Sequence, residues 1–172
     1  MNQIVEINKY FRNHHAAGSL LDEKQGSVKP QLPGDTRWNS QLDCIQTYLT
    51  NRPLMVLIVA EQDDPHSVID ARIVKLINNV GLLNEAKSLH AQLQPVANAL
   101  DRLQSDNATI ADACEEWLSL LRADALKPHL TTVMKRFKEA VTDNHFLAIC
   151  YIQNTKENIC LKLMKKLHDS CS

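Results

Sequence analysis

Several features that mark common protein classes are scarce in this sequence. Aromatic residues make up only 5% of its 172 residues and there are four glycines, which is poor material for a β-sandwich or barrel. The five cysteines are odd in number and form no Cys-x-x-Cys pair, which argues against a disulfide framework and a secreted protein. The longest uncharged apolar run, residues 53–60, is far shorter than the roughly 20 residues that cross a bilayer. We therefore expect no membrane partner.

Charge of one sign is also lacking overall. The 19 lysines and arginines nearly balance the 20 aspartates and glutamates, so no global basic field points to nucleic acid. The basic residues are nevertheless in excess over residues 127–172, where Lys135, Arg136 and Lys138 form one cluster. The residues alone favour a solvated lysine face, which is what such runs usually are. Contact with phosphate is the alternative.

Apolar residues recur at steps of three and four along most of the chain, which predicts an all-α protein. We expect an N-terminal helix over residues 1–17 and a loop rich in glycine and proline over residues 18–34. A helical domain should follow over residues 35–152 and a helical tail over residues 153–172. Within these ranges only residues 146–152 are ambiguous, since their β-branched and aromatic residues fit a short helix or a strand.

The clearest pattern is a leucine seam over residues 82–103, typical of a long helix with one buried side. Proline removes a backbone donor and clashes with the preceding turn. We therefore expect Pro95 to kink this helix or to split it in two, and Pro53 to end an earlier helix.

No catalytic or metal-binding constellation is visible. His14 and His15 are adjacent, so on a helix their side chains point about 100° apart and cannot share one metal ion as a pair four residues apart would. Glycine-rich phosphate loops are absent, and the acidic pairs are consecutive rather than brought together from separate elements. We expect no cofactor, no metal site and no enzymatic activity.

One short block carries more information, the five residues from Thr36 to Ser40. A loop ends in polar residues that can cap a helix, and Arg37 and Trp38 then lie in its first turn. Such a helix end suits a phosphate, and an indole offers a flat face for an unstacked base. Trp38 also begins an apolar stripe with Leu42 and Ile45, so the residues alone favour a core anchor over a binding residue.

The block Thr-Arg-Trp-Asn-Ser resembles the corresponding block of the hAT superfamily of DNA transposases, the hobo/Activator group. Three other segments agree with that family in their order along the chain. They are Tyr10-Phe11-Arg12-Asn13-His14-His15, Leu93-Gln94-Pro95-Val96 with Leu103-Gln104, and the helix around Trp117. The resemblance covers residues 4–150 approximately.

The resemblance implies a multi-helix array like the helical insertion domain of these transposases. In the family this insertion interrupts a ribonuclease-H-like core, whose three acidic residues bind divalent metal. The tryptophan of the block is thought to stack on a base flipped out at the cleaved DNA end. Carried over, Arg37 and Trp38 are the matching positions, and Trp38 is the stacking candidate.

The segments expected to carry the catalytic acids and the zinc-finger module find no match here. We therefore expect a truncated or domesticated transposase remnant, nuclear by resemblance and otherwise cytoplasmic, and catalytically incompetent alone. It should contact DNA weakly through Arg37, Trp38, Lys135, Arg136 and Lys138, and its further partners are itself or a full-length transposase. Two alternatives stay open: a helical protein-interaction or dimerisation scaffold using the seam at residues 82–103, and a remnant without selected function.

Overall fold

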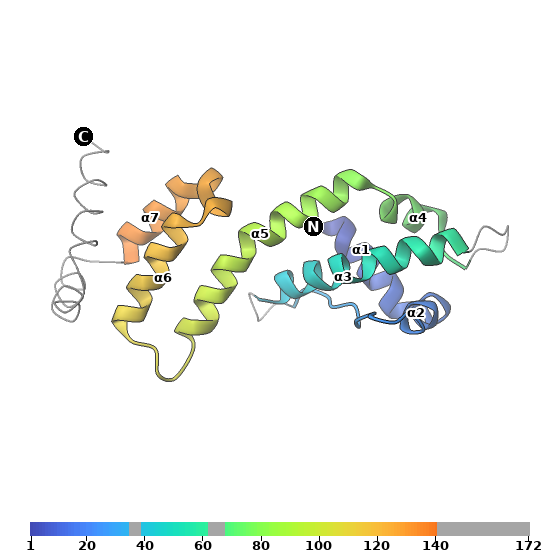
Figure 1. The fold of residues 1–172 in the computed structure, drawn as a ribbon, viewed down its shortest axis with the longest axis horizontal. Coiled ribbons are helices and arrows are strands. Elements are labelled where there is room, and N and C mark those ends of the chain that lie inside the picture. The colour runs from blue at the N-terminus through green and yellow to red at the C-terminus, as the bar shows by residue number, and fades with distance from the viewer. Residues whose placement is uncertain (35–38, 62–67, 141–172) are drawn as a thin grey trace. The chain divides into compact units, whose positions relative to one another are not determined.

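The computed structural model describes residues 1–34, 39–61 and 68–140, and every regular element within these ranges is helical (Figure 1). The expectation of an all-α chain is confirmed for this described part. The helices are α1 (Asn2–Asn13), α2 (His15–Asp22), α3 (Asn39–Glu61), α4 (Ala71–Ile77), α5 (Val80–Leu103), α6 (Ile110–Arg122), the 3₁₀-helix η1 (Asp124–His129) and α7 (Leu130–Ala140).

The chain divides into two compact units, residues 1–98 and residues 99–172. This boundary falls inside the helical domain that was expected over residues 35–152. The ambiguous stretch at 146–152 and the tail at 153–172 both lie outside the described residues. None of the helices in the described ranges is both long enough and apolar enough to span a membrane.

The first unit is built around α1, which packs against α2, α3 and α4. Each helix contributes one apolar face, as expected from the spacing of its residues. The first half of α5 adds Leu82 and Ala86 to the same core. Its other members are Ile4, Ile7, Phe11, Ala17, Leu21, Cys44, Ile45, Tyr48, Met55, Ile58, Ile69, Ile73 and Ile77.

The expected helix over residues 1–17 is instead two helices, because the chain turns at His14. The backbone of His14 is extended, with φ −92° and ψ 107°, and its Nδ1 accepts a hydrogen bond from the N–H of Ala17. This bond caps α2. The expected loop over residues 18–34 therefore contains the last five residues of α2, which ends at Asp22. A turn follows over residues 23–26 and includes Gly26, whose φ of 87° favours glycine.

Two prolines lie inside helices rather than at their ends. Contrary to expectation, α3 continues through Pro53 without a break. Tyr48 and Met55 are fully buried before and after the proline, so both halves of α3 are held on one core and the lost backbone bond is tolerated. Pro95 likewise lies within α5, so the alternative of two separate helices there is wrong.

In the second unit α6 packs against η1 and α7. The rings of Trp117 and Phe137 meet edge to face, with centroids 6.0 Å apart. Glu116 is buried, and its Oε1 lies 2.6 Å from Nη1 of Arg102. These contacts bind the helices of the unit to one another.

Candidate nucleic-acid interface

Arg37 and Trp38 lie outside the described residues, but the chain on either side of them is described. Gly34 and Ser40 form two hydrogen bonds with each other. The N–H of Gly34 donates to Oγ of Ser40 over 2.9 Å, and the same hydroxyl donates to the Gly34 carbonyl over 3.1 Å. The beginning of α3 is thus joined to the chain that leads into the block.

Residues 28–31, which we call the lead-in, precede the block and are attached to α3. Side chains of α3 form hydrogen bonds with the backbone of this segment. Asn51 accepts from the N–H of Val28 over 2.9 Å and donates to its carbonyl over 2.6 Å. One turn earlier, the Oγ1 of Thr47 accepts from the N–H of Gln31 over 3.1 Å. An extended segment therefore lies along α3 with three of its backbone groups bonded to the helix.

Asn8 joins α1 to the same arrangement. Its side chain is fully buried, and its Nδ2 donates to the carbonyls of Gln31 and Cys44 over 3.0 and 2.8 Å. Nδ2 also lies 3.4 Å from Sγ of Cys44. Burial raises the pKa of the Cys44 thiol, and the hydrogen bond from Asn8 lowers it by less.

The sequence analysis did not identify this set of polar contacts. A signal was present, because Asn8 and Asn51 fall between apolar residues at helical spacing. A polar residue in such a position is usually buried together with hydrogen-bond partners, so it indicates a specific contact. The identity of the partner, the backbone of residues 28–31, has no signature in the sequence. Both ends of the Asn51 amide have such partners, whereas in Asn8 the Nδ2 is bonded and the buried Oδ1 has no partner among the described residues.

The second part of the predicted interface lies on α7. Lys135, Arg136 and Lys138 are all exposed, as both the solvated-face interpretation and the phosphate-contact interpretation require. Arg136 forms an ion pair with Glu139, at 3.1 Å. In the described part of the chain no partner is found for Lys135. Arg136 and Lys138 both take part in interactions, so Lys135 is the one cation of the three without a partner among the described residues.

Lys135 and Lys138 also line a cavity of about 540 Å³ along α7. Its other lining groups include the apolar side chains of Leu130 and Met134. The face of α7 that carries the two lysines thus combines positive charge with apolar surface.

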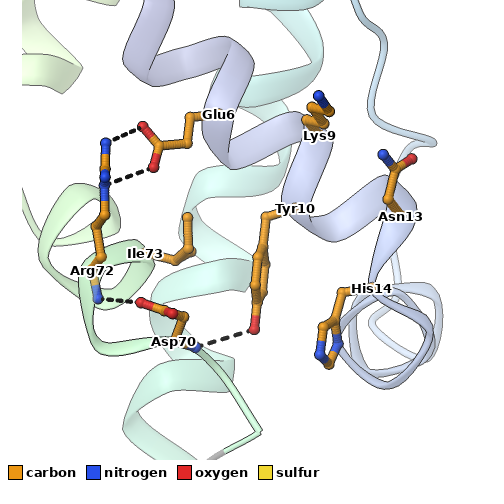
Figure 2. A pocket seen from close by; sticks show the side chains of 8 residues that line it. All are labelled: Glu6, Lys9, Tyr10, Asn13, His14, Asp70, Arg72 and Ile73. Carbon is orange, nitrogen blue, oxygen red and sulfur yellow. Dashed lines mark hydrogen bonds and ion pairs between the residues drawn. The ribbon is translucent and has the colours of Figure 1, made fainter.

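A different cavity, of about 430 Å³, lies between the second half of α1 and the start of α4 (Figure 2). Tyr10 stands at its centre, and its hydroxyl accepts a hydrogen bond from the backbone N–H of Asp70. On one side, Arg72 forms an ion pair with Glu6. The sequence analysis noted Tyr10 only as part of a family-like segment and did not predict a cavity there.

The leucine seam expected over residues 82–103 is largely used within the chain itself. Leu82 and Ala86 are buried in the core of the first unit, and Leu89 and Leu93 pack against that core. This half of the seam therefore packs within the first unit, with Leu89 and Leu93 partly buried.

Within the described ranges, no three His, Cys, Asp or Glu side chains lie close enough together to hold a metal ion. Comparison with known proteins adds no functional assignment: no protein-family model, curated protein or solved structure matches the chain.

Proposed function

We propose that this chain is a helical domain derived from an hAT-type transposase, which binds DNA through Arg37 and Trp38 and through the lysine face of α7. In this proposal the domain does no chemistry alone. It supplies two separate contacts, one for an unpaired base at Arg37 and Trp38 in the first unit and one for phosphates at α7 in the second. The family resemblance of the Thr36–Ser40 block is the reason for choosing DNA.

The observation that carries the proposal is the attachment of the chain on both sides of Arg37 and Trp38. Before the block, Thr47 and Asn51 fix residues 28–31 on α3, and at its end Ser40 bonds back to Gly34. Binding segments work best when rigid elements hold their ends, because less conformational freedom is then lost on binding. This arrangement supports a segment adapted for binding.

The exposed lysines support the proposal through a separate contribution. Each phosphate contact by a lysine releases counterions, which makes binding depend on salt and not on base sequence. Lys135 is exposed and has no ionic partner within residues 1–34, 39–61 and 68–140, as such a contact requires. A surface of this kind gives weak binding, which fits a domain that acts as part of a larger assembly.

The test is DNA binding measured by fluorescence anisotropy in a salt series, with a single strand and a hairpin as probes. We expect binding at low salt that Trp38→Ala lowers by about 5- to 150-fold, the value of one stacked base. Trp117→Phe serves as the matched control, because it removes the other indole while keeping an aromatic ring against Phe137. Circular dichroism and urea unfolding show whether each variant is folded.

Two outcomes would contradict the proposal. The first is the absence of wild-type binding at low salt. The second is unchanged DNA binding by a folded Trp38→Ala variant. Loss of the fold in Trp38→Ala would instead identify Trp38 as the core anchor that its apolar stripe with Leu42 and Ile45 also predicts.

A further inference from the structure

The helix α5 belongs to both units of the chain. It runs without interruption from Val80 to Leu103, whereas the first unit ends at Asn98 and the second begins at Ala99 (Figure 1). The chain therefore passes from one unit to the other inside a helix and not through a loop. A change in the orientation of one unit against the other requires this helix to bend.

The two ends of α5 are anchored in different units. Before Pro95, Leu89 and Leu93 pack against the core of the first unit. After it, Nη1 of Arg102 lies 2.6 Å from Oε1 of Glu116, which is buried on α6 in the second unit. Pro95 thus lies between two separately held segments of the same helix.

Pro95 weakens the helix at this place. Proline carries no backbone N–H, so the carbonyl of Ala91 loses its bond to the residue four positions later, and the proline ring crowds that carbonyl. Sharp bends in helices occur mostly at such positions. A side-chain bond crosses the turn, since Nε2 of Gln94 donates to Oδ1 of Asn98 over 2.8 Å at an exposed position. Pairs of this kind stabilise a helix only slightly, so the turn can bend while the helix persists.

Pro53 shows what a proline does where one core holds both sides of a helix. Tyr48 before it and Met55 after it are fully buried in the core of the first unit. Bending of α3 at Pro53 would pull one of them away from that core, so packing restrains the helix. At Pro95 the two sides are held by different units, and bending there leaves both sets of packing contacts intact.

We propose that Pro95 is a hinge in α5, at which the first and the second unit change their orientation relative to each other. Hinges are a few residues that absorb the backbone change while the packed parts on either side move as bodies. The consequence for DNA rests on the proposed function, in which the two units carry separate contacts. The hinge lets both contacts engage one DNA molecule, which raises affinity without any new contact.

The first test is made without DNA, by residual dipolar couplings of the whole ¹⁵N-labelled chain in a weakly aligning medium. The couplings of α1–α4 and those of α6–α7 each give a degree of order. We expect the two degrees of order to differ in wild type, because a hinge averages the orientation of one unit against the other. Pro95→Ala restores the missing backbone donor and should bring the two values together. A single alignment tensor that fits both units of wild type would overturn the proposal.

Pro53→Ala is the matched control. It also restores a backbone donor inside a helix, but the helix is one whose two sides already share a core. It should leave the two degrees of order as different as they are in wild type. Alanine is the better helix former at both positions, so we expect both variants to fold, which circular dichroism checks. An equal response to the two substitutions would refute a hinge at Pro95.

The second test measures the consequence for DNA by fluorescence anisotropy. The probes are a single strand of about four nucleotides, which suffices for one contact, and a hairpin with a long single-stranded flank. We expect Pro95→Ala to weaken the hairpin by about tenfold or more and to leave the short strand unchanged, because two-site binding is lost when geometry forbids it. Pro53→Ala should change neither affinity.

The two tests fail separately. Absence of wild-type binding to either probe would refute the proposed function, and the couplings would still decide the hinge. Unchanged hairpin binding by Pro95→Ala, or an equal loss for both probes, would overturn the role of the hinge in DNA binding.

Discussion

Asn51 binds both backbone polar groups of Val28 through the two ends of its amide, with contacts of 2.9 and 2.6 Å. The two residues are 23 positions apart, so a side chain of α3 takes the place of a β-strand partner for the chain before the Thr36–Ser40 block. Asn51 is itself fully buried. The pair therefore connects a buried position of the core with the segment that leads to the candidate interface.

Asn51→Leu should lower the free energy of unfolding by about 1–3 kcal/mol, because it preserves volume and leaves Val28 without these partners. Urea unfolding measures the loss, and faster hydrogen exchange at Val28 locates it. The control is Gln46→Ala, at an exposed position of the same helix, which should stay within about 0.5 kcal/mol. Unchanged exchange at Val28 would show that this pair does not hold the lead-in.

Gly18→Ala should destabilise the chain, although alanine is ordinarily favoured over glycine inside a helix by up to about 1 kcal/mol. A Cβ at Gly18 would lie 2.9 Å from the backbone oxygen of Phe11, and neither α1 nor α2 can move without disturbing buried residues. We expect a loss of about 1–3 kcal/mol. Ser19→Ala, the exposed neighbour, is the control, and a gain in thermal stability for Gly18→Ala would disprove the close packing of these two helices.

Arg102→Ala should destabilise the second unit more than Arg136→Ala does. Only 11% of the Glu116 side chain is exposed, so removal of Arg102 leaves a buried carboxylate without its ion pair. Since Arg102 itself is largely exposed, we expect a cost of about 1–2 kcal/mol rather than that of a fully buried pair. The exposed pair of Arg136 and Glu139 should be worth less than about 0.5 kcal/mol.

A double-mutant cycle between Arg102→Ala and Glu116→Gln tests this contact directly. The coupling energy should be favourable and should exceed that of the Arg136–Glu139 cycle. Equal coupling in the two cycles would mean that burial of Glu116 adds nothing to its interaction with Arg102.

Protonation of Asp112 at low pH should destabilise the beginning of α6. Hydrogen bonds from the hydroxyl and backbone N–H of Thr109 hold the pKa of this carboxyl below the usual range for aspartate. Its contribution to stability is therefore complete above the pKa of the unfolded chain, about 3.9, and is lost as pH falls through the lower folded value. Urea unfolding between neutral and strongly acidic pH measures the loss.

Comparison of variants isolates the effect of Asp112 from that of other carboxylates. Asp112→Asn should lose less stability than wild type in the acid range, because its side chain does not titrate. Asp106→Asn, in the turn before α6, is the control and should follow wild type. Parallel curves for Asp112→Asn and wild type would contradict the role of this capping contact.

Lys135→Gln should make DNA binding less dependent on salt. The slope of log K against log salt concentration should fall in magnitude by about 1, as expected for the loss of one phosphate contact. The substitution should weaken single strands of different sequence to a similar extent. Anisotropy titrations at several salt concentrations measure the slope, with Lys87→Gln as the equally charged control. An unchanged slope would show that Lys135 does not contact phosphate and that the lysines of α7 form only a solvated face.

A helix could be predicted from the sequence where its apolar stripe is also the face that is buried in the structure. Ile4, Ile7 and Phe11 mark the buried side of α1 in the sequence, and all three are in the core. The end of α1 at His14 was missed because the apolar pattern continues past it. The break lies at the extended backbone of His14, and its side chain bonds to the N–H of Ala17 and so caps α2.

The candidate interface was predictable only in part. Its lysines follow from composition and helical spacing, since a long charged side chain on an amphipathic helix is normally exposed. The partners of Asn8 and Asn51 depend on contacts between positions 23 to 36 residues apart, about which local patterns carry no information. The cavity beside Tyr10 likewise arises from the approach of α1 and α4.

The thiol of Cys44 is buried beneath Asn8, so its chemical modification reports on the opening of the first unit. A thiol reagent reaches this sulfur only when the two helices that enclose it separate, because the closed state leaves it no exposed surface. The modification rate of Cys44, resolved from the other cysteines by mass spectrometry, thus equals the frequency of that opening under fast labelling. The chain can report its own local unfolding without any introduced label.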